Sequence, residues 1–129
     1  MSPYGLPQLL LVGLGGFLGS ISRFVMAGAC NRFSPALGFP VGTLTVNILG
    51  CFLIGLLYGL AETRSLLSPD IRIFLFIGVL GGFTTFSTFG FESLALLKDG
   101  NILKASANIG LHVFLGLAAV WVGDNLGRL

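Results

Sequence analysis

The amino-acid sequence predicts an all-α membrane protein in which four transmembrane helices form a single domain over residues 1–129. Only 9% of the residues are charged and the mean hydropathy is +0.96, which excludes an ordinary soluble domain. Four apolar stretches each supply about the 20 residues that a helix needs to cross the hydrocarbon core. These stretches are residues 6–29, 41–61, 73–91 and 105–123, and the charged residues gather between them. We therefore expect a multi-pass protein of the cell (inner) membrane.

Composition also excludes several classes of function. The first stretch follows no basic residue and is interrupted by glycines and by Arg23, so we expect it to be retained and not cleaved as a signal peptide. Cys30 and Cys51 form no ligand or redox motif, and a net charge of +2 gives no basic patch for nucleic acid. The sequence contains no nucleophile–base pair, carboxylate pair or phosphate-binding loop, so we do not expect an enzyme.

The first stretch combines small residues with one charged residue inside the apolar run. Gly15 and Gly19 have the GxxxG spacing that lets a neighbouring helix approach closely. Arg23 costs roughly 2.5–3.5 kcal/mol at a bilayer centre unless its side chain reaches polar surroundings. It either extends to the membrane interface or faces a water-filled vestibule, where it concentrates anions.

The second stretch carries polar side chains on one helix face, with Thr43 and Asn47 four residues apart. An asparagine at membrane depth must find a hydrogen-bond partner. The Asn47 amide either bonds another helix or donates its N–H to an anion.

The third stretch is the most unusual, and we expect its helix to be broken near its middle. A cap signal at Ser68-Pro69-Asp70 precedes it, and Gly81-Gly82 weakens the helix within it. Hydroxyls then crowd between phenylalanines at every third position, in the order Phe83, Thr84, Thr85, Phe86, Ser87, Thr88, Phe89. Non-helical backbone at membrane depth marks an ion or substrate site. The alternative is an unbroken helix whose glycines serve packing alone. Glu92 follows as a boundary charge, either solvated or paired with an arginine.

The fourth stretch presents a polar stripe at successive four-residue steps: Lys104, Asn108, His112 and Gly116. His112 has no second histidine or acidic partner at metal-ligand spacing. Together with Asn47 and the hydroxyl run, the stripe provides N–H and O–H donors, and phenyl rings provide positive edges. These groups suit an anion, whereas carbonyls released by a break at residues 81–84 suit a small monovalent cation. Four short helices cannot enclose a pathway alone, so we expect a homo-oligomer.

Three motifs give a resemblance to a known family. They are GGFLGSISRF at residues 15–24, GTLTVNILGCFLIG at 42–55 and GGFTTFSTF at 81–89. In this order and spacing, the chain closely resembles the Fluc (CrcB) fluoride channels over essentially its whole length. The resemblance implies an antiparallel, dual-topology homodimer with two fluoride pathways and one structural sodium ion at its centre. It implies passive export of fluoride across the lipid bilayer.

The resemblance also assigns residues by position. Phe86 and Phe89 correspond to phenylalanines that line the pathways with their ring edges, and Asn47 corresponds to the pore asparagine. Gly81 and Thr84 correspond to residues whose backbone carbonyls hold sodium. Asn108, His112 and Gly116 stand where some members carry a Tyr and Ser residues along the fourth helix. The complete expected fluoride pathway is Arg23, Asn47, Thr85, Phe86, Ser87, Thr88, Phe89, Asn108 and His112.

Two other functions compete with a fluoride channel. A proton-coupled small multidrug exporter is also a four-helix dimer, but it needs a membrane-embedded carboxylate, and the first stretch contains no Asp or Glu. A non-transporting assembly subunit would explain the GxxxG spacing of Gly15 and Gly19 but not the hydroxyl and phenylalanine run.

Charge counting favours dual topology. With the N-terminus inside, Arg64, Arg72 and Arg128 lie inside and Arg32, Lys98 and Lys104 lie outside, with Arg23 left out. The seven Lys and Arg thus divide three against three with one undecided, and the positive-inside rule has almost no bias to act on.

Overall fold

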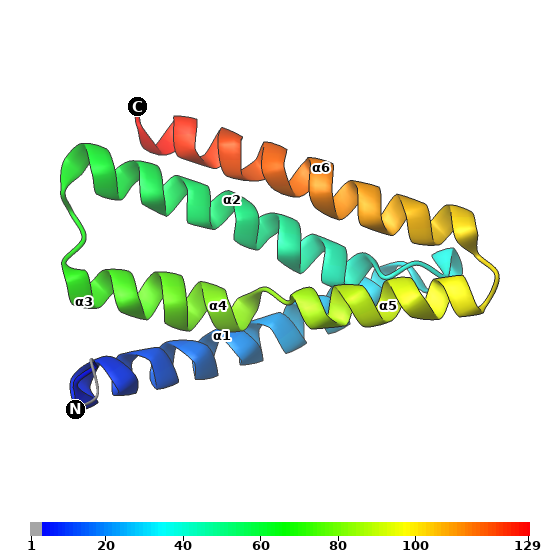
Figure 1. The fold of residues 1–129 in the computed structure, drawn as a ribbon, viewed down its shortest axis with the longest axis horizontal. Coiled ribbons are helices and arrows are strands. Elements are labelled where there is room, and N and C mark those ends of the chain that lie inside the picture. The colour runs from blue at the N-terminus through cyan, green and yellow to red at the C-terminus, as the bar shows by residue number, and fades with distance from the viewer. Residues whose placement is uncertain (1–3) are drawn as a thin grey trace.

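The computed structural model describes residues 4–129 and consists of long helical rods lying side by side (Figure 1). α1 (Leu6–Phe33), α2 (Val41–Arg64) and α6 (Ile102–Gly127) are continuous, and a fourth rod runs over Pro69–Lys98. All four are long and apolar enough to cross a membrane. The rods extend beyond the predicted stretches, to Phe33 in the first and Lys98 in the third, because helical hydrogen bonding continues into the polar flanks that hydropathy excludes.

The rods alternate in direction. The start of α1 and the end of α6 lie at the end where α2 turns into α3 (Pro69–Arg72). The connections through η1 (Pro35–Leu37) and between α5 (Phe86–Lys98) and α6 lie at the opposite end (Figure 1). Each end therefore receives the three Lys or Arg residues counted from the sequence.

α1 packs against the first half of the third rod through glycines, as the GxxxG spacing predicted. A Cβ atom at Gly15 would lie 2.7 Å from the Cα of Gly78, which is closer than real side chains tolerate. The two backbones are therefore in direct contact, and no larger residue fits at this crossing. α2 and α6 pack against each other along most of their length in the same way (Figure 1).

The third rod is composed of four pieces: α3, a π-helical segment η2 (Ile73–Leu80), α4 (Gly81–Phe83) and α5. The hydroxyl of Ser68 accepts a hydrogen bond from the Ile71 amide at 3.4 Å, and Pro69 occupies the first turn, so the predicted N-terminal cap is confirmed. The π-helical segment was not predicted, since a purely apolar run such as IFLFIGVL gives no sign of its helical pitch. π-Helical turns are rare and often lie beside functional sites.

Candidate functional site

The backbone leaves the helical conformation at two residues between α4 and α5. Thr84 has φ −86° and ψ 157°, and Thr85 has φ −150° and ψ 116°, both extended. Gly81 remains helical at φ −62° and ψ −38°. The non-helical residues therefore follow the glycines: Thr84 is the last residue of the expected interval 81–84, and Thr85 lies just beyond it.

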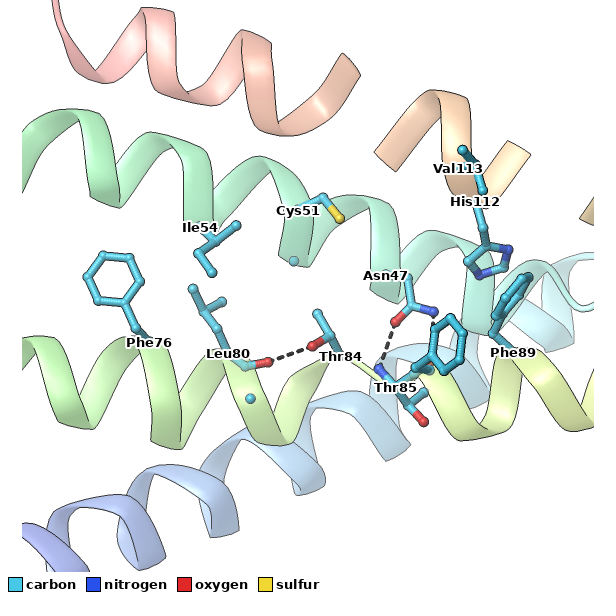
Figure 2. Close-up of a pocket in the computed structure, with 13 residues that line it drawn as sticks. Asn47, Cys51, Ile54, Phe76, Leu80, Thr84, Thr85, Phe89, His112 and Val113 are labelled. Atoms are coloured by element: carbon cyan, nitrogen blue, oxygen red, sulfur yellow. Dashed lines mark hydrogen bonds between the residues drawn. The ribbon is translucent and has the colours of Figure 1, made fainter. Parts of the chain in front are cut away.

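Asn47 on α2 binds both polar groups of the Thr85 backbone. The Thr85 amide donates to Asn47 Oδ1 at 2.8 Å, and Asn47 Nδ2 donates to the Thr85 carbonyl at 3.0 Å (Figure 2). In a continuing helix the Thr85 amide would instead donate to the Gly81 carbonyl. The Asn47 side chain thus replaces the helical partners of an extended residue, and one of its two amide hydrogens remains available.

Hydroxyls form hydrogen bonds with the backbone on both sides of the extended Thr84–Thr85 segment, here called the interruption. Thr84 Oγ1 donates to the Leu80 carbonyl at 2.9 Å, which also accepts from the Thr84 amide at 3.0 Å. Thr85 Oγ1 caps α5 by accepting from the Thr88 amide at 3.3 Å. It also donates to Thr88 Oγ1 at 3.0 Å and lies 3.3 Å from Ser87 Oγ, which is exposed. The hydroxyls of Thr85, Ser87 and Thr88 therefore form one connected cluster, whereas the Thr84 hydroxyl bonds the preceding helical turn.

A cavity of about 380 Å³, here called the phenylalanine cavity, opens beside the interruption (Figure 2). It is lined by Asn47, Gly50, Cys51, Ile54, Phe76, Leu80, Gly81, Thr84, Thr85, Phe86, Phe89, His112 and Val113. Gly50 is required here because a Cβ atom would collide with the Thr84 methyl group. The cavity brings together seven of the residues singled out from the sequence: Asn47, Gly81, Thr84, Thr85, Phe86, Phe89 and His112.

Three aromatic rings follow one another along this cavity. The ring centroids of Phe86 and Phe89 are 5.4 Å apart with their planes inclined at 55°. The Phe89 ring lies 4.3 Å from the His112 ring at 42°, and Figure 2 shows the two approaching from α5 and α6. Phe86 is 83% exposed, so the cavity opens to the surface on that side.

Asn108 is fully buried and ties α6 to α5 at Phe89. Its Nδ2 donates to Ser93 Oγ at 3.0 Å, and Ser93 Oγ donates to the Phe89 carbonyl at 2.8 Å. His112 Nδ1 lies 2.9 Å from the Asn108 carbonyl, which can only accept, so Nδ1 carries a hydrogen. Sequence reasoning missed Ser93, because nothing in the chain marks it as the partner of a residue fifteen positions later.

A second cavity of about 510 Å³, here called the arginine cavity, shares Thr85 with the phenylalanine cavity. Its lining includes Arg23, Thr43, Thr85, Thr88 and Glu92. Arg23 Nε donates to the Gly82 carbonyl at 3.1 Å, so its guanidinium bonds α4 and lines a polar cavity. Thr85 therefore lines both cavities.

The expectation for Glu92 was wrong. It is neither a solvated charge nor paired with an arginine, because the helix continues to Lys98 and places its carboxylate between helices. Thr43 Oγ1 donates to Glu92 Oε1 at 2.7 Å, and Oε2 is buried without a partner among the described residues.

The remaining polar stripe on α6 is also engaged. Lys104 Nζ donates to the Leu37 carbonyl at 2.9 Å, and Gly116 faces Cys51 of α2. Among residues 4–129, no group of three or more His, Cys, Asp or Glu side chains could hold a metal. The oxygens at the interruption are backbone carbonyls and hydroxyls, which suit a hard monovalent cation or, through O–H and N–H, an anion.

Comparison with known proteins places this site in a family context. The family model described as "CrcB-like protein, Camphor Resistance (CrcB)" matches residues 10–124. A relative from Methylobacillus flagellatus is 47% identical over 122 residues, covering 95% of each chain, and is named a fluoride-specific ion channel. Proteins with the same name from Nitratidesulfovibrio vulgaris and Chlorobium phaeobacteroides are 46% and 50% identical, over 95% and 93% of this chain and 98% and 92% of their own.

Proposed function

The chain belongs to the CrcB family, a family of membrane transport proteins and not of enzymes, and on that premise we propose that it is a fluoride-selective channel. The proposed activity is passive conduction of fluoride out of the cell. The observation that carries the proposal is the pair of cavities meeting at Thr85, lined by hydrogen-bond donors and phenyl rings.

The phenylalanine cavity offers an anion a suitable combination of weak contacts. A phenyl ring is positive at its edge, so Phe86 and Phe89 can attract fluoride without a full charge. The second amide hydrogen of Asn47 adds a donor in this cavity, and the Thr88 hydroxyl, whose neighbour Thr85 already donates to it, adds one in the arginine cavity. The exposed Ser87 hydroxyl is proposed to continue the path between them. Binding of this strength permits entry and still permits release, as conduction requires.

The interruption supplies fixed partial charges of both signs. In this proposal it is a functional break in a transmembrane helix, as discontinuous helices are in transporters. The first turn of α5 directs backbone N–H groups towards Thr85, and a helix N-terminus favours anions. Arg23, which bonds the adjacent Gly82 carbonyl, adds a positive charge in the arginine cavity. Asn108 fixes the Phe89 backbone from behind through Ser93.

A structural sodium ion is proposed at the backbone oxygens of Gly81 and Thr84. The Gly81 carbonyl loses its usual helical donor because the Thr85 amide donates to Asn47. Gly81 is also exposed, with only the Phe76 carbonyl within 4 Å of a Cβ atom placed there, at 3.7 Å. Released carbonyls at the end of a half-helix are suitable ligands for sodium. The ion would hold this turn in place by neutralising the carbonyl dipoles.

An antiparallel homodimer completes the proposal. Extended backbone at membrane depth must be covered by protein. Gly81 and Phe86 flank the extended residues and are exposed on this protomer, so a second copy is the proposed cover. The three-against-three charge distribution leaves insertion in either direction similarly favourable.

Fluoride efflux from liposomes that contain the purified protein tests the function. Efflux into fluoride-free buffer is expected when a potassium ionophore balances charge, and chloride efflux is expected to be much slower. Fluoride efflux only in the presence of an imposed proton gradient would support a proton-coupled exporter. An absence of efflux under both conditions would support a non-transporting assembly subunit.

Sodium can be tested by comparing two substitutions. Gly81→Val places a branched side chain on the exposed surface that the proposed ion and the second copy would occupy, whereas Thr84→Ser keeps the backbone and the hydroxyl. We expect Gly81→Val to reduce sodium retention and dimerisation more than Thr84→Ser does. Fluoride efflux that is identical with and without sodium, after exhaustive dialysis, would argue against the ion.

A further inference from the structure

His112 carries an unsatisfied nitrogen at the phenylalanine cavity. Its Nδ1–H is committed to the Asn108 carbonyl at 2.9 Å, and its Nε2 atom is buried with no partner among the described residues. In the neutral ring this leaves Nε2 with a lone pair and no hydrogen. A buried acceptor with no donor is costly, and it repels an anion in the same cavity.

We propose that His112 forms a proton-dependent fluoride site in which the imidazolium Nε2–H is the donor. This inference rests on the proposed function. A hydronium ion at the cavity mouth gives its proton to the Nε2 lone pair, so an N–H bond forms, an O–H bond breaks and water leaves. The proton stays on the nitrogen while fluoride binds and departs.

The neighbours of His112 favour this arrangement. The Phe89 ring centroid lies 4.3 Å from the imidazole, a separation that allows a cation–π interaction with the protonated ring. A phenyl ring offers no hydrogen-bond acceptor, so the new N–H remains available to an anion. Asn108 is itself fully buried and held by Ser93, so it fixes the ring orientation and keeps Nδ1 protonated in both states.

The charged groups nearby leave His112 as the candidate proton acceptor of the cavity. On α2, Cys51 lines the same cavity and is the other titratable side chain there. On α5, Glu92 faces the arginine cavity and accepts from Thr43, and Arg23 of α1 lies in that same cavity. On α6, Lys104 is bonded to the loop carbonyl of Leu37.

The test measures fluoride current across planar bilayers at equal pH on both sides, because neutral hydrogen fluoride carries no current. Wild-type current is expected to rise as the pH is lowered, because only the protonated ring carries the Nε2–H donor. His112→Asn retains an N–H for the Asn108 carbonyl but cannot titrate, so its current is expected to be independent of pH. Cys51→Ala is the matched control and should keep the wild-type pH dependence.

A second measurement keeps the proposal testable if His112→Asn fails to assemble. His112 is the only histidine in the sequence, so ¹⁵N-histidine labelling of a tag-free protein gives signals from one ring. If protonation strengthens fluoride binding, fluoride must in turn favour protonation, because linkage is reciprocal. Replacing gluconate by fluoride should therefore move the titration of the ring to higher pH.

The outcomes separate the two proposals. A wild-type channel that conducts equally at all pH values, or an unshifted titration in fluoride, overturns the His112 site and leaves the channel intact. The same holds if His112→Asn retains the wild-type pH dependence. Absence of fluoride current at every pH overturns the proposed function itself.

Discussion

The two hydrogen bonds between Asn47 and the Thr85 backbone give the sharpest prediction about stability. Asn47→Ala removes both and leaves the Thr85 amide and carbonyl without these partners. An unsatisfied buried group costs roughly 1–3 kcal/mol, and hydrogen bonds between membrane helices average about 0.6 kcal/mol. For two groups these values bracket a loss of roughly 1–6 kcal/mol in the free energy of unfolding, measured in mixed detergent micelles.

Asn125→Ala is the matched control for this prediction. Asn125 is also an asparagine on a long helix, but its Nδ2 donates to the Trp121 carbonyl of its own α6 and its side chain is exposed. We expect its substitution to change the unfolding free energy by no more than about 0.5 kcal/mol. If Asn47→Ala is as stable as Asn125→Ala, the bond to Thr85 does not maintain the extended turn and the argument is wrong.

Three further predictions follow from other contacts. Phe86→Ile and Phe89→Ile should assemble but conduct poorly, because aliphatic groups lack a positive edge. Phe114→Ile, on the exposed face of α6, should conduct normally. Bilayer currents measure the difference, and normal current in all three variants would remove the two rings from the pathway. Gly15→Val should disrupt packing against Gly78 and lower the melting temperature by several degrees. At Gly13 an added Cβ atom meets no atom within 4 Å, so Gly13→Val should leave the melting temperature unchanged. Equal melting temperatures for the two variants would show that the backbone contact is dispensable. Adding two or three lysines to the α2–α3 connection should fix one membrane orientation and abolish fluoride efflux. Co-expression with a copy biased to the opposite orientation should restore the efflux. Full efflux from one orientation alone would contradict the antiparallel dimer.

The sequence predicts the rods well because hydropathy alone determines them. Long uncharged runs bounded by charges need no knowledge of tertiary contacts, and the spacing of Gly15 and Gly19 was sufficient to predict a close helix crossing. The ends of the rods were less predictable, since helices continue past the hydrocarbon into residues such as Lys98.

The site was predictable in its composition but not in its connections. The sequence left Asn47 with two possible roles, and the structure shows the bond to another helix while one amide hydrogen stays available for the other role. Glu92 was assigned to the membrane boundary because it directly follows the apolar run in the sequence, but α5 continues past it and its carboxylate packs against Thr43. The bond from Asn108 to Ser93 joins separate helices, so only their packing reveals it.

The central claim is that fluoride crosses passively through this protein, and the reversal potential of the current tests it most directly. Under a tenfold fluoride gradient with equal pH on both sides, a passive fluoride pore reverses at about 59 mV, the value for a single charge. We predict this value, and we predict that it stays unchanged when a proton gradient is added. A reversal potential that follows the proton gradient, or that moves to the chloride equilibrium when chloride is present, would contradict the account.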